Sequence, residues 1–369
     1  MSATSGGRAA GTSVLFVTSR LRTGGGLTLL QHRVAHLRDE PVRMSIVALH
    51  PTHAGDPAAV EALRAFEAAD VPVHVLEHRS TKDLPRTVVQ VARLARAVDV
   101  VHQVAGPDSI PAAASRLARR PLIRDIITSN PEDLPRGFRR GGRTATVNLA
   151  ISHAAAASAG APRTRVIYPH LATAEQRGEA VPPVPEAGDP TVLVVSRLSA
   201  RKGIERLPDV ISATAQRLPG VRFLIAGDGE LRRSLEEEIV RRALSPHVAV
   251  LGARDDVPGL HSLADIYLSP SAAEGLVGYA TIEAATYGTP IVATSIPAVT
   301  EVLEDGSDAL LVDPADGLGM ADAIVRLARD PELAARLASG AARAIDEAID
   351  VRRSTEELVA LYDTFGPAG

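Results

Sequence analysis

Short β-branched apolar runs alternate with helical segments along most of this chain, and this alternation constrains the fold more than any other feature. Residues 13–19 (SVLFVTS) predict a strand, and a helix follows because apolar residues recur at helical spacing from Leu27 to Leu37. Further strands are predicted at 44–50, 71–77, 99–105 and 121–128, with helices at 58–69 and 87–98. This order is typical of α/β proteins with parallel, doubly wound sheets.

The length of 369 residues exceeds that of an average single domain, so two domains of similar size are expected. Residues 174–190 are rich in proline and glutamate without an apolar period, and they predict a linker. We therefore expect a first domain over residues 1–173 and a second over residues 191–350, with residues 351–369 containing a last helix.

The composition indicates a protein of the reducing interior of the cell. Apolar residues make up 45% and charged residues 23% of the chain, which is ordinary for a globular protein with buried sheets. Cysteine is absent, which excludes disulfides and thiolate-bound metals. The apolar run 14–17 is too short for a secretory core, and no run approaches the roughly 20 apolar residues that span a bilayer. We expect a soluble, cytoplasmic protein without a transmembrane segment.

The charge is distributed unevenly along the chain. Residues 1–174 contain 22 Lys and Arg against 13 Asp and Glu, whereas the rest contains 18 against 31. A basic first half suits an anionic acceptor or peripheral binding to an anionic membrane surface, and an Arg-rich loop at 136–143 could hold either. Arginines on solvated helix faces and a mobile surface loop explain the same charges equally well.

Two carboxylates stand in the stretch 269–294, which reads as loop, helix and strand. Glu274 lies in a loop that contains Gly275 and Gly278, and Glu283 lies one turn into a helix predicted at 279–287. A helix that opens from a glycine-containing loop can bind an anion through its unpaired N–H groups, and two nearby carboxylates can accept hydrogen bonds from sugar hydroxyls. A glutamate that only stabilises the helix start explains Glu283 as well.

Two basic residues stand at the end of the strand predicted at 191–198 and just after it. Arg197 ends this strand, and Lys202 precedes Gly203 and the next helix. A guanidinium group and an ammonium group can stabilise the charge of a departing diphosphate, although two basic residues on such a loop can also be plain surface charges.

The motifs RLSARKG (197–203), LIAGDGEL (224–231) and the stretch 269–294 together resemble the carboxyl half of the retaining GT-B glycosyltransferases of family GT4. The resemblance implies an α/β fold with two Rossmann-like, doubly wound domains facing a central cleft, and a last helix that crosses back to the first domain. The family separates its two glutamates by seven residues, whereas eight lie between Glu274 and Glu283. The spacing from Gly278 to Glu283 equals that of the family, so we expect the extra residue to bulge the loop around Leu276 and Val277.

The resemblance also implies roles for individual residues. Arg197, Lys202 and Glu274 are the expected catalytic residues, Glu274 acting on hydroxyls of the transferred sugar. The expected donor-binding residues are Gly24, Gly25, Gly26, Gly252, Gly275, Leu276, Val277, Gly278 and Glu283. The expected acceptor-side residues are His102, Thr128 and Ser129, with a buried structural histidine as the alternative for His102. The family histidine near the end of strand 121–128 is not matched, because Thr128, Ser129 and Asn130 stand there.

The expected activity is the retaining transfer of a sugar from a nucleoside-diphosphate sugar to a hydroxyl-bearing acceptor. The acceptor is a small molecule or a lipid-linked one, and no metal, other cofactor, protein nucleophile or nucleic acid is expected. A non-catalytic paralogue that binds a sugar nucleotide stays open, as do a GT-B epimerase and a phosphorylase. The sequence leaves the sugar, the base and the acceptor open.

Overall fold

The structure is a computed structural model that describes residues 11–22, 24–51, 57–105, 109–130, 144–169, 189–254, 256–316 and 318–366. The chain divides into two compact units, the first comprising Met1–Leu171 with Ile349–Gly369 and the second comprising Ala172–Ala348. Most of the expected linker and the Arg-rich loop at 136–143 lie outside the described residues.

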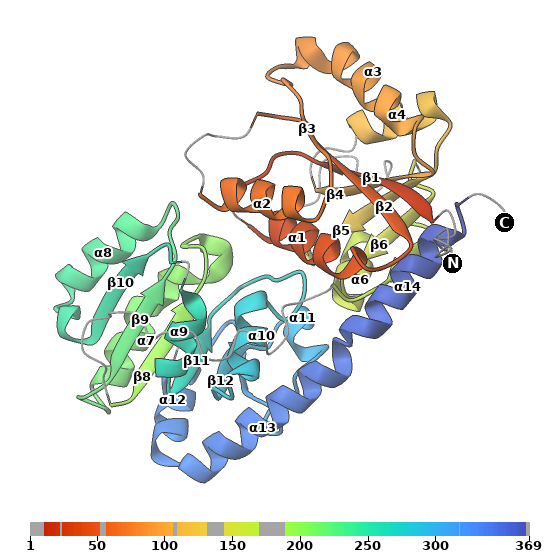
Figure 1. The fold of residues 1–369 in the computed structure, drawn as a ribbon. Helices are drawn as coiled ribbons and strands as arrows, with labels where there is room; N and C mark the ends of the chain where they lie inside the picture. Colours follow the sequence, from red (N-terminus) through yellow and green to blue (C-terminus); the bar gives the residue numbers. More distant parts are fainter. Residues whose placement is uncertain are drawn as a thin grey trace, which may run out of the picture. The chain divides into compact units, whose positions relative to one another are not determined.

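A seven-stranded parallel sheet forms the centre of the first unit (Figure 1). Its strands lie in the order β3 (Val73–Val75), β2 (Val42–Ala48), β1 (Thr12–Thr18), β4 (Val100–Ala105), β5 (Leu122–Ile126), β6 (Val147–Ala150) and β7 (Thr164–Val166). All seven residues of β1 are buried, as expected for a strand covered on both faces. The order reverses direction between β1 and β4, which is where such sheets bind ligands.

Helices cover both faces of this sheet. They are α1 (Gly25–Leu37), α2 (Pro57–Ala68), α3 (Leu84–Ala95), α4 (Ser109–Ala118), α6 (His153–Ala159) and α14 (Val351–Asp363). Helices α3 and α4 lie side by side in Figure 1, and they pack on one face of the sheet through Leu15, Val17 and Val101. Helix α4 was not expected from the sequence, because Pro111 near its start resembles a loop signal.

Helix α14 completes the first unit, although it comes from the end of the chain. Asp350 caps the helix by accepting a hydrogen bond from the Arg353 N–H at 3.0 Å. Leu358, Leu361 and Tyr362 are buried, and Asp363 at the other end accepts a 2.9 Å hydrogen bond from Thr12 of β1. The last helix, expected within residues 351–369, thus belongs to the first unit.

A six-stranded parallel sheet forms the second unit. Its strands lie in the order β10 (Val248–Gly252), β9 (Arg222–Ala226), β8 (Thr191–Val195), β11 (Ile266–Ser269), β12 (Ile291–Thr294) and β13 (Leu310–Val312). From β8 the chain proceeds outward through β9 and β10, and from β11 it proceeds the other way through β12 and β13. The point where the order reverses therefore lies between β8 and β11.

The helices of the second unit are amphipathic and pack on both faces of its sheet. They are α7 (Leu207–Ala215), α8 (Arg232–Arg241), α9 (Val257–Leu263), α10 (Tyr279–Thr286), α11 (Pro297–Thr300), α12 (Gly319–Arg329) and α13 (Pro331–Ala348). The core joins Val192, Phe223 and Leu268 of the sheet to Ile211 of α7 and Ile324 of α12. In the part of the chain that is described, no helix combines the length and the apolar character needed to cross a membrane.

Candidate functional site

The loops that follow β8 and β11 carry the main residues expected to be catalytic. Lys202 lies on the loop after β8, and Glu274 lies on the loop after β11. Because β8 and β11 are parallel neighbours, both loops leave the same edge of the sheet at the point where the strand order reverses. This is the place where open α/β sheets bind ligands.

Gly203 brings the two loops together. Its φ of 68° lies in the left-handed region, and a Cβ at this position would lie 1.9 Å from the carbonyl oxygen of Pro270. A neighbouring backbone hydrogen bond, from the Ala272 N–H to the Arg201 carbonyl at 2.9 Å, joins the same loops. The glycine of the RLSARKG motif is therefore required because only glycine permits both the φ angle and the close approach.

We expect Gly203→Ala to destabilise the protein by about 2–4 kcal/mol, because the new methyl group adds backbone strain to a steric clash. Urea unfolding measures this change. Gly288→Ala is the matched control, because Gly288 also has a positive φ of 71° but no described atom lies within 4 Å of its Cβ position. The control should lose only about 1 kcal/mol. Equal losses for both variants would contradict the role of the close approach.

Lys202 and Glu274 form an ion pair at this junction. The Lys202 Nζ contacts Glu274 Oε1, and the Ser271 hydroxyl donates a hydrogen bond to the same carboxylate oxygen at 2.7 Å. The side chains of Lys202 and Glu274 are 21% and 10% exposed, so the pair is largely shielded from water. The sequence predicted both residues but neither this pairing nor the role of Ser271, because neither leaves a spacing signal.

Arg197 lies apart from this pair. Its guanidinium contacts Glu230 at 3.5 Å, and the two side chains are 68% and 58% exposed. Such a surface ion pair contributes little to stability, about 0–1 kcal/mol, so Arg197 can exchange Glu230 for another anion at low cost.

The loop from Gly275 to Gly278 directs its apolar side chains toward the interior of the second unit. The chain bends at Gly275, Leu276 and Val277, where the extra residue was expected, and the side chains of Leu276 and Val277 are buried. Gly278 has a φ of 98° and precedes α10, and a Cβ there would lie 3.8 Å from the Glu274 carboxylate. The buried side chains of Leu276 and Val277 anchor this loop, and Gly278 at its end is partly exposed beside the Glu274 carboxylate.

Glu283 lies on α10, with its side chain 36% exposed. Its Oε2 is 3.6 Å from Nε2 of His261, a buried residue of α9 that the sequence analysis did not single out. The signal that could have identified His261 is its polarity at a position next to Leu260 on the buried face of a short helix.

Gly252 ends β10 with a φ of 72°, and a Cβ there would lie 3.0 Å from the Arg232 guanidinium. The Gly252 carbonyl accepts a 2.7 Å hydrogen bond from the N–H of Gly227, which opens the Gly-Asp-Gly turn. Gly229 of the same turn packs against the Leu198 carbonyl, because a Cβ there would lie 2.3 Å from that oxygen. These contacts hold the Gly-Asp-Gly turn against the ends of β8 and β10.

Of the three glycines after β1 that were expected to bind the donor, Gly25 and Gly26 belong to helix α1. Helix α1 starts at Gly25, so only Gly24, with a φ of 141°, precedes it. The first N–H groups of a helix have no partner within the helix. Gly24 and Gly25 at the start of α1 are exposed to solvent. Of the expected acceptor-side residues, Thr128 and Ser129 lie just beyond the carboxyl end of β5, Thr128 buried and Ser129 partly exposed.

His102 does not face a crevice. It is 0% exposed in the middle of the sheet, and its Nε2 lies 3.0 Å from Asp125 while its Nδ1 lies 2.7 Å from the Tyr362 hydroxyl. Since Asp125 accepts, Nε2 carries the proton and Tyr362 donates to Nδ1. The expected acceptor-side position of His102 is therefore corrected, and the alternative of a buried structural histidine holds because α1 and α14 cover this face.

Arg33 of α1 completes a buried charged network. It donates to both oxygens of Asp125, with Nη2 at 3.0 Å from Oδ1, and the Asp125 side chain is 0% exposed. Although burial raises the pKa of the Asp125 carboxyl, the charge of Arg33 and the hydrogen bonds that Arg33 and His102 donate outweigh this effect, so that its pKa lies below the ordinary value. Burial lowers the pKa of His102, which keeps its ring neutral. The network joins α1, β4, β5 and α14.

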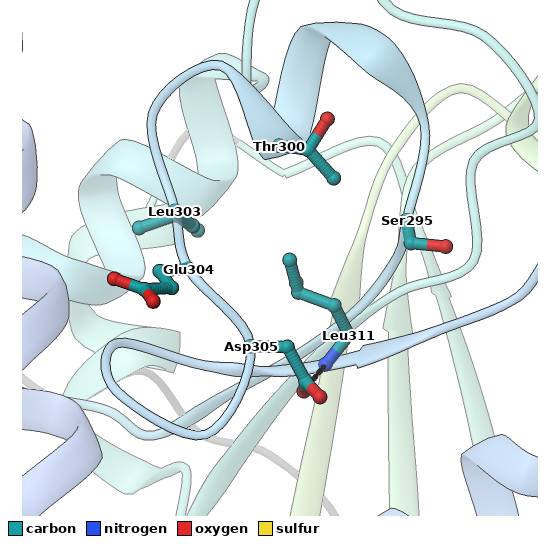
Figure 2. A pocket seen from close by; sticks show the side chains of 6 residues that line it. All are labelled: Ser295, Thr300, Leu303, Glu304, Asp305 and Leu311. Carbon is teal, nitrogen blue, oxygen red and sulfur yellow. Dashed lines mark hydrogen bonds between the residues drawn. The ribbon is translucent and has the colours of Figure 1, made fainter.

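An open hollow of about 610 Å³ lies elsewhere on the second unit, next to β13 (Figure 2). Ser295, Thr300, Leu303, Glu304, Asp305 and Leu311 line it. As Figure 2 shows, the Asp305 carboxylate accepts a hydrogen bond from the Leu311 N–H at 2.8 Å, so it holds its own loop. The lining residues are distinct from the predicted site residues.

Residues 189–330 match the family described as glycosyl transferases group 1. The chain is 34% identical over 179 residues to an alpha-D-kanosaminyltransferase of Streptomyces kanamyceticus. The aligned region covers 48% of this chain and 46% of that relative. It is 31% identical over 184 residues to a phosphatidyl-myo-inositol mannosyltransferase of Mycobacterium leprae, covering 48% of each. The chain thus spans about half the length of the curated relatives it matches.

Solved structures resemble nearly the whole chain. Anabaena Alr3699/HepE in complex with UDP-glucose has a TM-score of 0.80 at 24% identity, covering 96% of this chain and all 100% of that one. TarM of S. aureus, in a complex with Fondaparinux, alpha-GlcNAc-glycerol and UDP, has a TM-score of 0.76 at 13% identity over 95% of this chain and 99% of that one. The fold is therefore GT-B.

The match of residues 189–330 to this family agrees with the GT4 resemblance that the motifs of the second unit predicted.

Proposed function

We propose that the protein is a retaining glycosyltransferase that moves a sugar from a nucleoside-diphosphate sugar to a hydroxyl group of an acceptor. The observation that carries this proposal is the shielded Lys202–Glu274 pair at the point where the strand order of the second sheet reverses. The family match of the same unit supports the proposal, as do the sugar-transferring relatives.

The Lys202 ammonium group of this pair can exchange its partner Glu274 for the substrate. Glu274 holds the Lys202 ammonium in place while the site contains no donor, and a diphosphate oxygen then takes over as its partner. As the bond between the sugar carbon and the diphosphate breaks, its electron pair moves to the diphosphate, and Lys202 with Arg197 stabilises the growing charge. The released Glu274 carboxylate accepts a hydrogen bond from a hydroxyl of the transferred sugar.

The remaining groups hold the donor and the acceptor. Glu283 accepts hydrogen bonds from the ribose hydroxyls, and the backbone of the Gly275–Gly278 loop contacts the sugar and the diphosphate. The acceptor hydroxyl attacks the face from which the diphosphate leaves, forms the new bond to the sugar carbon and gives its proton to the departing diphosphate. No protein nucleophile and no metal take part.

We assign acceptor binding mainly to the first unit and place the enzyme in the cytoplasm, either free or peripheral at the membrane. The basic balance of residues 1–174 suits an anionic acceptor or a lipid headgroup, and one relative is named for a phosphatidylinositol acceptor. The absence of cysteine is compatible with a reducing compartment.

A thermal-shift screen with UDP, GDP, ADP and TDP sugars tests the donor class. At a hundredfold excess over its Kd, the correct donor should stabilise the fold by about 2.7 kcal/mol, which raises the Tm by about 5 °C or more. Mass spectrometry of the stabilised mixture with candidate acceptors should then show a glycosylated product. Stabilisation without turnover across glycerol, inositol and lipid acceptors would favour a non-catalytic binding protein instead.

A further inference from the structure

His261 is a buried polar residue of the second unit that the proposed chemistry does not use. It lies in the second half of α9 and is 1% exposed, and neither of its ring nitrogens has a hydrogen-bond partner among the described residues. A buried polar group without a partner costs about 1–3 kcal/mol, so such groups are rare outside functional sites. The position of His261 therefore requires an explanation.

Two aromatic side chains fix the plane of the His261 ring. The Tyr287 ring stacks on it with a centroid separation of 5.7 Å and an interplanar angle of 6°. The Tyr267 ring, from β11, packs on it at 5.5 Å with a tilt of 45°. Since the ring is held between α10 and β11, the direction in which Nε2 points is fixed before any ligand arrives.

Nε2 of this fixed ring is 3.6 Å from Oε2 of Glu283, slightly too long for a hydrogen bond. The Glu283 carboxylate is partly exposed, so one of its oxygens can meet a ligand while the other is near the histidine. A small rotation of the carboxylate closes the gap to hydrogen-bond distance, with the Nε2–H donating. In this tautomer Nδ1 is left as an acceptor only.

We propose that His261 is a positioning residue that locks Glu283 in the orientation needed to bind the vicinal hydroxyls of a ribose. The inference rests on the proposed function, because it assigns the occupant of Glu283 as the ribose of the nucleoside diphosphate. When the two hydroxyls bind one side of the carboxylate, the His261 Nε2–H binds the other side. The hydrogen bond that is too long without ligand is then made, so its free energy adds to nucleotide binding.

The test compares UDP, ADP and GDP with their 2′,3′-dideoxy forms by titration calorimetry. The variants are His261→Phe, which keeps an aromatic ring between Tyr267 and Tyr287, Glu283→Gln and the double variant. We expect the wild type to prefer the ribose form of the nucleotide that binds. His261→Phe should weaken binding of this form about tenfold and leave the dideoxy form unchanged, and it should add nothing to Glu283→Gln.

His261→Gln supplies a rescue, because its side-chain amide can donate from nearly the position of Nε2. It should restore part of the preference for the ribose form, while a merely structural role of His261 predicts equal losses for both forms. Equal losses, or an undiminished preference in His261→Phe, would overturn the inference and leave the glycosyltransferase proposal intact. Failure of the wild type to bind any of the six nucleotides would overturn the inference, and failure to bind TDP as well would overturn the glycosyltransferase proposal.

Discussion

Lys202→Met should lower kcat about 10²–10³-fold, with a smaller change in the KM for the donor. The ammonium acts most strongly on the charge that develops on the leaving diphosphate, and preorganised groups of this kind contribute about that factor. The substitution also leaves the Glu274 carboxylate, 10% exposed, without its cationic partner and near the incoming diphosphate. Steady-state kinetics with the donor identified by thermal shift measure the effect.

Arg233→Ala is the matched control for this loss of one positive charge. Arg233 is 90% exposed on α8 and pairs only with Glu237 four residues later among the ion pairs described, so its removal should leave kcat unchanged. Lys202→Arg should recover part of the rate, because it keeps the charge but not the geometry. A Lys202→Met enzyme with wild-type kcat would contradict the role of the Lys202–Glu274 pair.

Asp125→Ala should reduce the free energy of unfolding by about 3–5 kcal/mol, because it leaves the buried Arg33 guanidinium without its carboxylate. Tyr362→Phe removes only the hydroxyl that binds His102 and should cost about 1–2 kcal/mol. Urea unfolding measures both. Since Tyr362 lies on α14, the result also tests whether the end of the chain is an integral part of the first unit.

Asp39→Ala is the control, because the Asp39 and Arg38 side chains are 84% and 63% exposed and such pairs contribute little. Asp125→Asn, whose side chain cannot ionise, tests how the stabilising effect of the Asp125 carboxylate depends on pH. The Asp125 carboxyl has a pKa below its ordinary value, so its stabilising effect is present above about pH 4 and is lost as the pH falls through the folded-state pKa. The difference between wild type and Asp125→Asn should narrow at acid pH. Comparable losses for Asp39→Ala and Asp125→Ala would contradict this account.

The fold could be predicted from the sequence because its periodic signals are local. The strand expected at 13–19 and the helix expected at 58–69 lie within one residue of β1 (Thr12–Thr18) and α2 (Pro57–Ala68). Helix α4 was missed because Pro111 near its start resembles a loop signal. Strand β3 is shorter than expected because only Val73–Val75 pairs with β2. Local patterns indicate what an element is, but its ends depend on its neighbours in space.

The site was predicted only in part, because spacing reveals which residues share a loop but not which loops meet. The sequence predicted Lys202 and Glu274 separately, while the pair depends on the contact between Gly203 and Pro270. His102 was placed near an acceptor because it lies on a strand of the first sheet, yet its hydrogen-bond partners Asp125 and Tyr362 are 23 and 260 residues away along the chain. Such long-range partners leave no mark in a single sequence.

The central claim is that positive groups of the second unit hold a diphosphate. The most direct measurement is titration calorimetry of the matching nucleoside diphosphate and monophosphate with wild type and with Arg197→Ala/Lys202→Ala. We expect the wild type to bind the diphosphate at least about tenfold more tightly, since two charge-assisted contacts are added, and the double variant to bind both nucleotides alike. A double variant that keeps the wild-type preference for the diphosphate would contradict the account.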